Sequence, residues 1–205
     1  MIKNILFDMG NVLLRFEPET FIRLSEAESE EDRLLLRRVV YHSIEWVKLD
    51  TGELDDDGAL AVMLPKLPER LHAAARRLVT GWADYGLKVD GMEELVQEIS
   101  DAGYVPYLLT NAAYTQRRYF PNYPVSRFFG ERIFLSAEQK LTKPNTEYFL
   151  SALRYFALRA DECVFIDDSP TNAEAAARCG IHSLVFQNDP GLLREELKDL
   201  GVHIS

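Results

Sequence analysis

The chain has 205 residues, of which 47% are hydrophobic and 27% are charged, and these proportions are ordinary for a soluble globular protein. The length suits one sizeable domain, or a core domain that carries a small insertion. No apolar run approaches the roughly 20 residues that a membrane helix needs, so we expect no membrane partner. The N-terminal MIKNILFDMG reaches Asp8 too early for the apolar core of a signal peptide, which favours a cytoplasmic protein.

The net charge is −10, from 23 basic and 33 acidic side chains. A global acidic field repels polyphosphate backbones, so we expect no nucleic-acid partner. A small phosphorylated ligand would need cations placed locally at its site. Cys163 and Cys179 are interpreted as reduced, inert core thiols. We expect a monomer or a weak homodimer.

The predicted elements fall into two groups along the chain. An apolar run over residues 3–8 predicts a strand that ends in a carboxylate. From residue 18 to about 82, apolar residues recur at helical spacing with no convincing strand, which predicts three to five helices. The turns between these helices are expected at residues 51–52, 55–58 and 65–68.

Strands and helices alternate after residue 90. Strands are predicted over residues 104–110, 132–135, 163–167 and 182–186, and helices over residues 92–102, 113–120, 146–158, 171–179 and 189–200. Alternation of this kind implies a parallel sheet covered on both faces. We therefore predict an α/β, doubly wound, Rossmann-like core of residues 1–16 and 85–205, with a small all-helical insertion, residues 17–84, after the first strand.

Three carboxylates are expected to meet at one edge of the sheet. Asp8 follows the first predicted strand, and Asp167 and Asp168 end the next-to-last one. Ligands of open parallel sheets bind at the carboxyl ends of strands. Clustered carboxylates repel one another unless a cation lies among them, so these three call for a hard ion such as Mg²⁺.

An anion site is expected beside the metal. Thr110 can donate its hydroxyl to a phosphate oxygen, and Asn111 can cap the helix that follows, whose free N–H groups attract an anion. Lys143 supplies the remaining positive charge. Together these groups form an anion site and a metal site with a carboxylate nucleophile between them.

Four segments in order carry a family resemblance: FDMGNVL, LLTN, LTKPNTEYF and FIDDSPTNAEAA. They resemble the four motifs of the haloacid dehalogenase superfamily, over nearly the whole chain. The likeness is greatest to the α-D-glucose-1-phosphate phosphatase-like branch, and the insertion, with WVKLDTGEL in its middle, resembles the helical cap of subfamily I. The resemblance implies a magnesium-dependent phosphatase acting on a small phosphorylated metabolite, such as a hexose 1-phosphate.

The resemblance also assigns roles. It implies that Asp8 is the nucleophile and a metal ligand, that the Gly10 carbonyl and Asp168 are ligands, and that Asp167 acts directly or through a water. Thr110, Asn111 and Lys143 would hold the transferring phosphoryl group. Arg15, Trp46 and Asp50 are candidates for substrate specificity, and Asn172 is a candidate for orienting the acidic loop.

Gly10 departs from the family pattern, which usually has a second Asp there as general acid and base. Several members of the resembled branch share a DxGN pattern, so the change is compatible with activity. Either the enzyme prefers leaving groups that depart without protonation, or Asp50 or Glu53 of the insertion replaces the acid. The sequence favours the first alternative, because an ionised carboxylate near phosphate is repelled.

Other functions stay open on the sequence. Carbon–halogen hydrolysis would use the same nucleophile without a metal, and the Asp167-Asp168 pair argues against it. A phosphomutase is a further alternative that Gly10 weakens. A non-catalytic metabolite-binding protein is also consistent with the missing second Asp.

Overall fold

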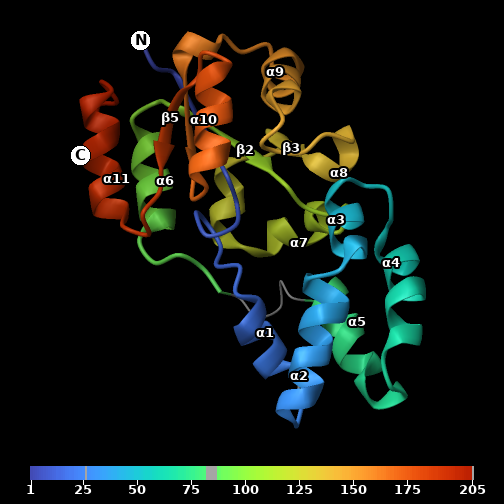
Figure 1. The fold of residues 1–205 in the computed structure, drawn as a ribbon. Helices are drawn as coiled ribbons and strands as arrows, with labels where there is room; N and C mark the ends of the chain where they lie inside the picture. The colour runs from blue at the N-terminus through green and yellow to red at the C-terminus, as the bar shows by residue number, and fades with distance from the viewer. Residues whose placement is uncertain (26, 82–86, 205) are drawn as a thin grey trace.

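The computed structural model describes residues 1–25, 27–81 and 87–204. Its sheet has five parallel strands in the order β3-β2-β1-β4-β5 (Figure 1). The strands are β1 (Asn4–Phe7), β2 (Val105–Thr110), β3 (Ile133–Leu135), β4 (Cys163–Asp167) and β5 (His182–Val185). Each lies where the sequence predicts a strand, so the alternation after residue 90 identified the sheet correctly.

Helices cover both faces of the sheet. Along β1, Ile5 and Phe7 belong to the apolar cluster under one pair of helices, whereas Leu6 belongs to the cluster under the other pair. The first pair is α6 (Met92–Asp101) and α11 (Pro190–Asp199), and the second is α9 (Thr146–Tyr155) and α10 (Pro170–Arg178). The predicted doubly wound α/β fold is confirmed.

A separate group of helices follows β1 in the chain and lies together at one end of the molecule (Figure 1). It comprises α1 (Pro18–Leu24), α2 (Glu30–Leu36), α3 (Ile44–Asp50), α4 (Asp56–Met63) and α5 (His72–Thr80), with a π-helical turn Arg37–Tyr41 after α2. Phe21, Leu60 and Leu78 are buried in an apolar cluster of its own. The expected limit of the insertion, between residues 84 and 85, lies outside the described residues.

Short elements complete the chain. The helices α7 (Gln116–Tyr119) and α8 (Ser136–Gln139) have four residues each. Turns of 3-10 helix lie at Leu64–Lys66, Glu69–Leu71, Phe120–Asn122, Pro124–Phe128 and Ala160–Glu162. The α-helical part of the predicted helix 113–120 is shorter than expected, and the chain turns through Pro121 as a 3-10 helix.

The turn after α3 packs closely against α8, which follows β3. Gly52 has a φ of +67°, and a Cβ there would lie 2.2 Å from the Ala137 carbonyl oxygen, so only glycine fits this approach. The next turn, which lies where the sequence predicts one, caps α4, because Asp55 Oδ1 accepts the Gly58 N–H at 2.8 Å. The α3–α4 connection is thereby held in one place on the core.

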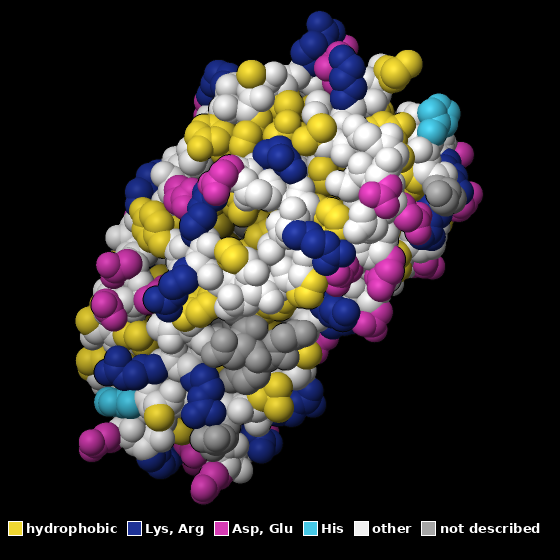
Figure 2. All heavy atoms as spheres, turned by 180° about the vertical axis from the view of Figure 1, so that it is seen from behind, with side chains coloured by type: hydrophobic (Ala, Val, Ile, Leu, Met, Phe, Trp, Pro, Cys, Tyr) yellow, Lys and Arg dark blue, Asp and Glu magenta, His cyan; other side chains and the backbone are white. Residues whose placement is uncertain are grey.

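The cysteines, the surface charge and the helix lengths bear on the expectations from composition. Cys163 and Cys179 are free, as expected. Acidic and basic side chains are interspersed on the face shown in Figure 2. Among the described residues, no helix has both the length and the apolar character needed to cross a membrane.

Candidate active site

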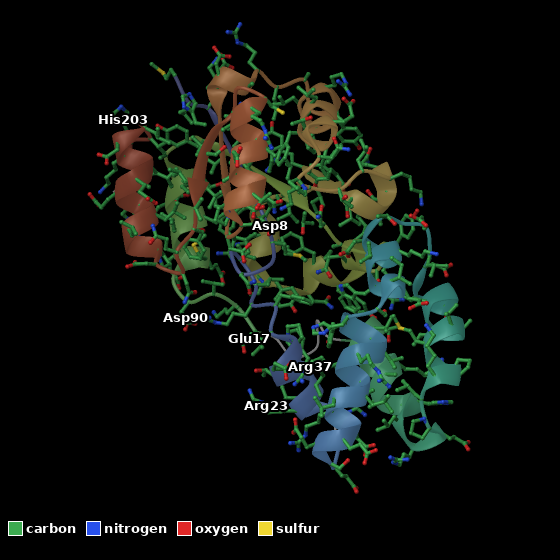
Figure 3. The ribbon with its side chains drawn as sticks, in the orientation of Figure 1. Asp8, Glu17, Arg23, Arg37, Asp90 and His203 are labelled. Carbon is green, nitrogen blue, oxygen red and sulfur yellow. The ribbon has the colours of Figure 1, made fainter. Side chains whose placement is uncertain are left out.

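Asp8 lies directly after β1, between the sheet and the α1–α5 helices (Figure 3). Its backbone N–H donates to the Ile166 carbonyl at 2.9 Å, which continues the parallel pairing of β1 with β4 by one step. The residue is only 8% exposed. A carboxylate is thus fixed at the carboxyl edge of the central strand, where ligands of such sheets bind.

Lys143 bridges two of the acidic side chains. Its Nζ lies 2.8 Å from Asp8 Oδ1 and 2.6 Å from Asp167 Oδ2, and the side chain is buried. Desolvation lowers the pKa of Lys143, but the two carboxylates outweigh it and the pKa is raised, so the ammonium keeps its charge. Burial raises the pKa of Asp8 to about 6, although Lys143 lowers it in part.

The predicted carboxylate cluster is formed. Asp8, Asp167 and Asp168 each offer an oxygen within 4.8 Å of the other two. One ammonium cannot balance three carboxylates at this spacing, and the donors are all oxygens, so the set fits a hard divalent cation such as Mg²⁺.

Two asparagines hold the acidic loop. Asn172 Nδ2 donates to both Asp167 oxygens, at 3.0 and 3.1 Å, so the candidate orienting residue does contact that loop. Asn11 Nδ2 donates to Asp168 Oδ2 at 3.0 Å, and its Oδ1 accepts the Phe16 N–H at 3.0 Å. Sequence reasoning missed Asn11, although its place directly after Gly10 in the first motif was a signal.

The expectation that Asn111 caps the following helix is wrong. The amide instead bonds the backbone of Lys143: Oδ1 accepts the Lys143 N–H at 2.8 Å and Nδ2 donates to the Lys143 carbonyl at 2.9 Å. Helix α7 begins only at Gln116, with Thr115 as its N-cap and no side-chain cap bond. Thr110 ends β2, is buried and lines the cavity beside Asp8.

A cavity of about 210 Å³ opens in front of Asp8. Its polar floor is formed by Lys143 of the loop before α9, by Asn172 of α10 and by residues at or after the strand ends: Asp8, Gly10, Asn11, Thr110, Asn111 and Asp168. Its other wall is largely apolar and includes Phe16, Trp46, Leu49 and Val79. The cavity therefore joins a charged end to an apolar end, as in many small-molecule sites.

The three specificity candidates fall in different places. Trp46 and Asp50 of α3 line the cavity with Asp8. Trp46 packs against Phe16 and Tyr41, with ring centroids 5.9 and 4.7 Å away. Arg15 does not line it and borders a separate hollow beside Asn188. The structure therefore brings two of the three candidates to the cavity in front of Asp8.

Two polar residues of the site were missed from the sequence. Gln116 is 3% exposed, lines the cavity and has no hydrogen-bond partner for its Nε2 within the described chain. Ser136 accepts the Ala112 N–H at 2.8 Å and donates to the Asp50 carbonyl at 2.6 Å, which ties α3 to the sheet domain. Neither position carries a local sequence signal, because each depends on contacts between distant segments.

Comparison with curated proteins gives two relatives with named activities. The chain is 28% identical over 190 residues to sesquiterpene phosphatase astK of Aspergillus oryzae, covering 89% of this chain and 88% of that protein. It is 25% identical over 175 residues to flavin mononucleotide hydrolase 1 of Arabidopsis thaliana, covering 80% of this chain. The match spans 65% of the Arabidopsis protein, which is less than two thirds of its length.

Solved structures agree on the fold. A predicted haloacid dehalogenase-like hydrolase of Porphyromonas gingivalis has a TM-score of 0.71 at 22% identity, with 98% of both chains covered. A Bacteroides thetaiotaomicron enzyme in complex with magnesium and inorganic phosphate has a TM-score of 0.66 at 22% identity, with 94% and 99% covered. A family model matches residues 2–180. With Asp8, the Lys143 bridge and the acidic loop at one sheet edge, this chain belongs to the haloacid dehalogenase-like hydrolase family.

Proposed function

We propose that the protein is a magnesium-dependent phosphatase that hydrolyses a small phosphorylated metabolite through an aspartyl-phosphate on Asp8. The observation that carries this proposal is the Lys143 bridge, 2.8 Å from Asp8 and 2.6 Å from Asp167, beside a third carboxylate. The bridge keeps the nucleophile ionised in a buried place. The Aspergillus and Arabidopsis relatives, named as a phosphatase and a nucleotide hydrolase, support the same reaction class.

Four side chains of this protein would have distinct roles in the reaction. Asp8 Oδ attacks phosphorus and the bond to the leaving oxygen breaks, after which water cleaves the aspartyl-phosphate. Lys143 balances charge around the phosphoryl group, and Thr110 donates its hydroxyl to it. Asn111 acts through Lys143, since its amide is engaged by the lysine backbone.

Asp8, the Gly10 carbonyl and Asp168 would hold the magnesium. Asp167 would act through a water, because its oxygens already accept from Lys143, Asn172 and the Ser169 N–H. When bound, the ion supplies electrostatic stabilisation of the phosphoryl oxygens. The magnesium and phosphate held by the Bacteroides relative support this assignment.

The organic part of the substrate is proposed from the resemblance and the cavity. The resemblance to the α-D-glucose-1-phosphate phosphatase-like branch favours a sugar phosphate. The cavity wall is apolar apart from Asp50, Thr115 and Gln116, and this favours a leaving group with few hydroxyls. The Aspergillus relative, named for a sesquiterpene, adds a prenyl phosphate to the esters worth testing.

Residues 17–84 are proposed to form a subfamily I cap domain that closes over the site and contributes specificity. Its contribution to the cavity, Trp46, Leu49, Asp50 and Val79, supports this role. The sheet domain of residues 1–16 and 85–205 would then carry the nucleophile and the metal site.

Phosphate release from a panel of esters tests the proposal. The panel should include p-nitrophenyl phosphate, glucose 1-phosphate, flavin mononucleotide and a prenyl phosphate, each with Mg²⁺ and with EDTA. We expect steady, Mg²⁺-dependent release that is lost in Asp8→Asn. A folded Asp8→Asn variant that still turns over, or release that survives EDTA, contradicts the mechanism. Binding without turnover would identify a metabolite-binding protein instead.

A further inference from the structure

Gly10 has no side chain, so this position near Asp8 provides no proton donor for the oxygen of the leaving group. Glycine is not required there by the backbone, because its φ lies outside the left-handed region and a Cβ would meet only Phe16 Cβ, at 3.8 Å. The absence of a side chain is therefore a chemical feature of the site and not a demand of the fold. A donor for the leaving group, if one exists, has to come from elsewhere in the cavity.

Asp50 is the remaining acid on the cavity wall. Among the described residues that line the cavity, the carboxylic acids are Asp8, Asp168 and Asp50, and the first two belong to the metal cluster. Asp50 is not a member of that cluster. Burial and the charge of Asp8 act on its carboxyl and no side-chain hydrogen bond does, so within the described chain it stands beside the cavity without a hydrogen-bonded partner.

The backbone of Asp50 is anchored to the sheet domain. Ser136 Oγ donates to the Asp50 carbonyl at 2.6 Å, and the same hydroxyl accepts from the Ala112 N–H, two residues after Thr110. Two residues further on, the Gly52 carbonyl accepts from Lys140 Nζ and from the Tyr114 hydroxyl. A carboxyl carried at the end of α3 is thus held at a fixed distance from the core that bears the nucleophile.

We propose that Asp50 is the general acid and base of the reaction, in place of the missing side chain at residue 10. This inference rests on the proposed phosphatase function. As Asp8 Oδ bonds to phosphorus and the ester bond breaks, the proton of Asp50 moves to the leaving oxygen and the alcohol departs. The Asp50 carboxylate then takes a proton from the attacking water, whose oxygen bonds to phosphorus as the Asp8–phosphorus bond breaks. Inorganic phosphate leaves, and both side chains return to their starting states.

The electrostatic surroundings agree with this role. Burial, and to a lesser degree the charge of Asp8, raise the pKa of Asp50 to about 7, so a large share carries a proton at neutral pH. Neither nearby ammonium neutralises it, because Lys143 is engaged by Asp8 and Asp167, and Lys140 by the Gly52 carbonyl. A protonated carboxyl also removes the repulsion by phosphate that the sequence alone counted against a cap acid.

Glu53, the other acid considered from the sequence, is a matched control. It lies in the same segment, but it is exposed, does not line the cavity and accepts from the Thr51 hydroxyl at 3.2 Å. Glu53→Gln and Asp50→Asn each remove one carboxylate, at positions that are three residues apart in the chain. A general electrostatic effect of the cap would appear in both variants, and proton transfer only in Asp50→Asn.

The test is the dependence of kcat/KM on leaving-group acidity, measured with p-nitrophenyl, phenyl, benzyl and ethyl phosphate. We expect Asp50→Asn to lose about 10²–10⁴-fold on the alkyl esters, with a loss that shrinks steadily as the leaving group becomes more acidic. Glu53→Gln should shift all four esters by the same small factor. Adding Gly10→Asp to Asp50→Asn should restore a substantial part of the alkyl activity.

The outcomes of the leaving-group experiment distinguish the acid role of Asp50 from a packing role and from failure of the proposed function. A folded Asp50→Asn protein whose loss is equal on all four esters overturns the acid role and leaves Asp50 as a packing residue. If Asp50→Asn does not fold, the wild-type slope decides: a steep dependence on leaving-group acidity shows that no proton is delivered. Failure of the wild type to release phosphate even from p-nitrophenyl phosphate would instead contradict the phosphatase function itself.

Discussion

The side-chain amide of Asn111 forms two hydrogen bonds with the backbone of Lys143: it accepts the N–H at 2.8 Å and donates to the carbonyl at 2.9 Å. The two residues lie 32 positions apart in the chain, so one side chain fixes the loop that carries the only ammonium described at the acidic cluster. The position of the positive charge beside Asp8 therefore depends on an amide that belongs to a different motif.

Asn111→Ala tests this relationship. Loss of both bonds leaves two partly buried backbone groups to find new partners, at a cost of about 1–3 kcal/mol in the free energy of unfolding. We expect kcat to fall more than KM rises, because the ammonium is displaced from the nucleophile. Urea unfolding and steady-state kinetics measure the two effects. An unchanged kcat in a destabilised protein would show that Lys143 needs no such support.

Lys143→Met should couple stability to pH. Removal of the ammonium leaves Asp8 and Asp167 buried without a cation, which typically costs about 3–5 kcal/mol. The folded pKa of Asp8, already raised to about 6, would then rise further above its unfolded value, so stability is lost as pH rises and regained as pH falls. We expect the deficit in the free energy of unfolding to be clearly larger at pH 7.5 than at pH 5. A deficit independent of pH would mean that the lost packing of the lysine stem dominates.

Asp50→Asn should stabilise the protein at neutral and higher pH. The pKa of Asp50 is raised from 3.8 to about 7, so the folded state holds its proton more tightly than the unfolded state. The stability that this residue supports is therefore full below about pH 4 and declines as pH rises to about 7. The uncharged amide avoids that decline, and we expect a gain of about 1–2 kcal/mol at pH 8 and none at pH 4. Glu53→Gln, the exposed control, should show no such pH dependence.

Much of the site could be predicted because it follows from sheet topology. Asp8, Thr110 and Asp167 each end an apolar run, and parallel strands bring those ends to one edge. The hydrogen-bond partner of the Asn111 side chain could not be predicted in the same way. An asparagine that caps the next helix and one that bonds a backbone 32 residues away look alike in a local sequence. The Ser136 bond to Asp50 also joins segments that lie 86 residues apart, so a local sequence does not show it.

Helix ends show the same limit on a smaller scale. The periodic pattern predicts a helix over residues 146–158, but α9 ends at Tyr155. Ala157 adopts a left-handed φ of 54°, and Leu158 then packs with the cluster under α9 and α10 without being helical. Alanine gives no sequence signal for such a turn, which usually falls to glycine or asparagine.

Trp46→Ala should change preference among substrates more than the chemical step. Trp46 faces the cavity from α3 and stacks near Phe16, so its removal widens the apolar end without touching the strand-end groups. We expect kcat/KM to fall by about 10-fold or more for the preferred ester and much less for p-nitrophenyl phosphate. Val47→Ala, an exposed neighbour on α3, is the control and should alter neither. Equal losses on every ester would argue against a specificity role.

The metal assignment separates Asp168 from Asn11. Asp168 belongs to the carboxylate cluster, whereas Asn11 contacts it through a 3.0 Å bond to Oδ2. Titration calorimetry with Mg²⁺ should show binding abolished in Asp168→Ala and weakened by about 10–100-fold in Asn11→Ala, the range typical of residues that orient a ligand.

Thermal unfolding gives a second measurement of the same binding. In the wild type, saturating Mg²⁺ should raise the midpoint of thermal unfolding, since a ligand that binds only the folded state stabilises it. Asp168→Ala should lack that shift, and Asn11→Ala should need more Mg²⁺ to reach it. If Asp168→Ala keeps wild-type affinity, the ion is held elsewhere. If Asn11→Ala is indistinguishable from wild type in both measurements, its contact with Asp168 serves only the backbone turn at Phe16.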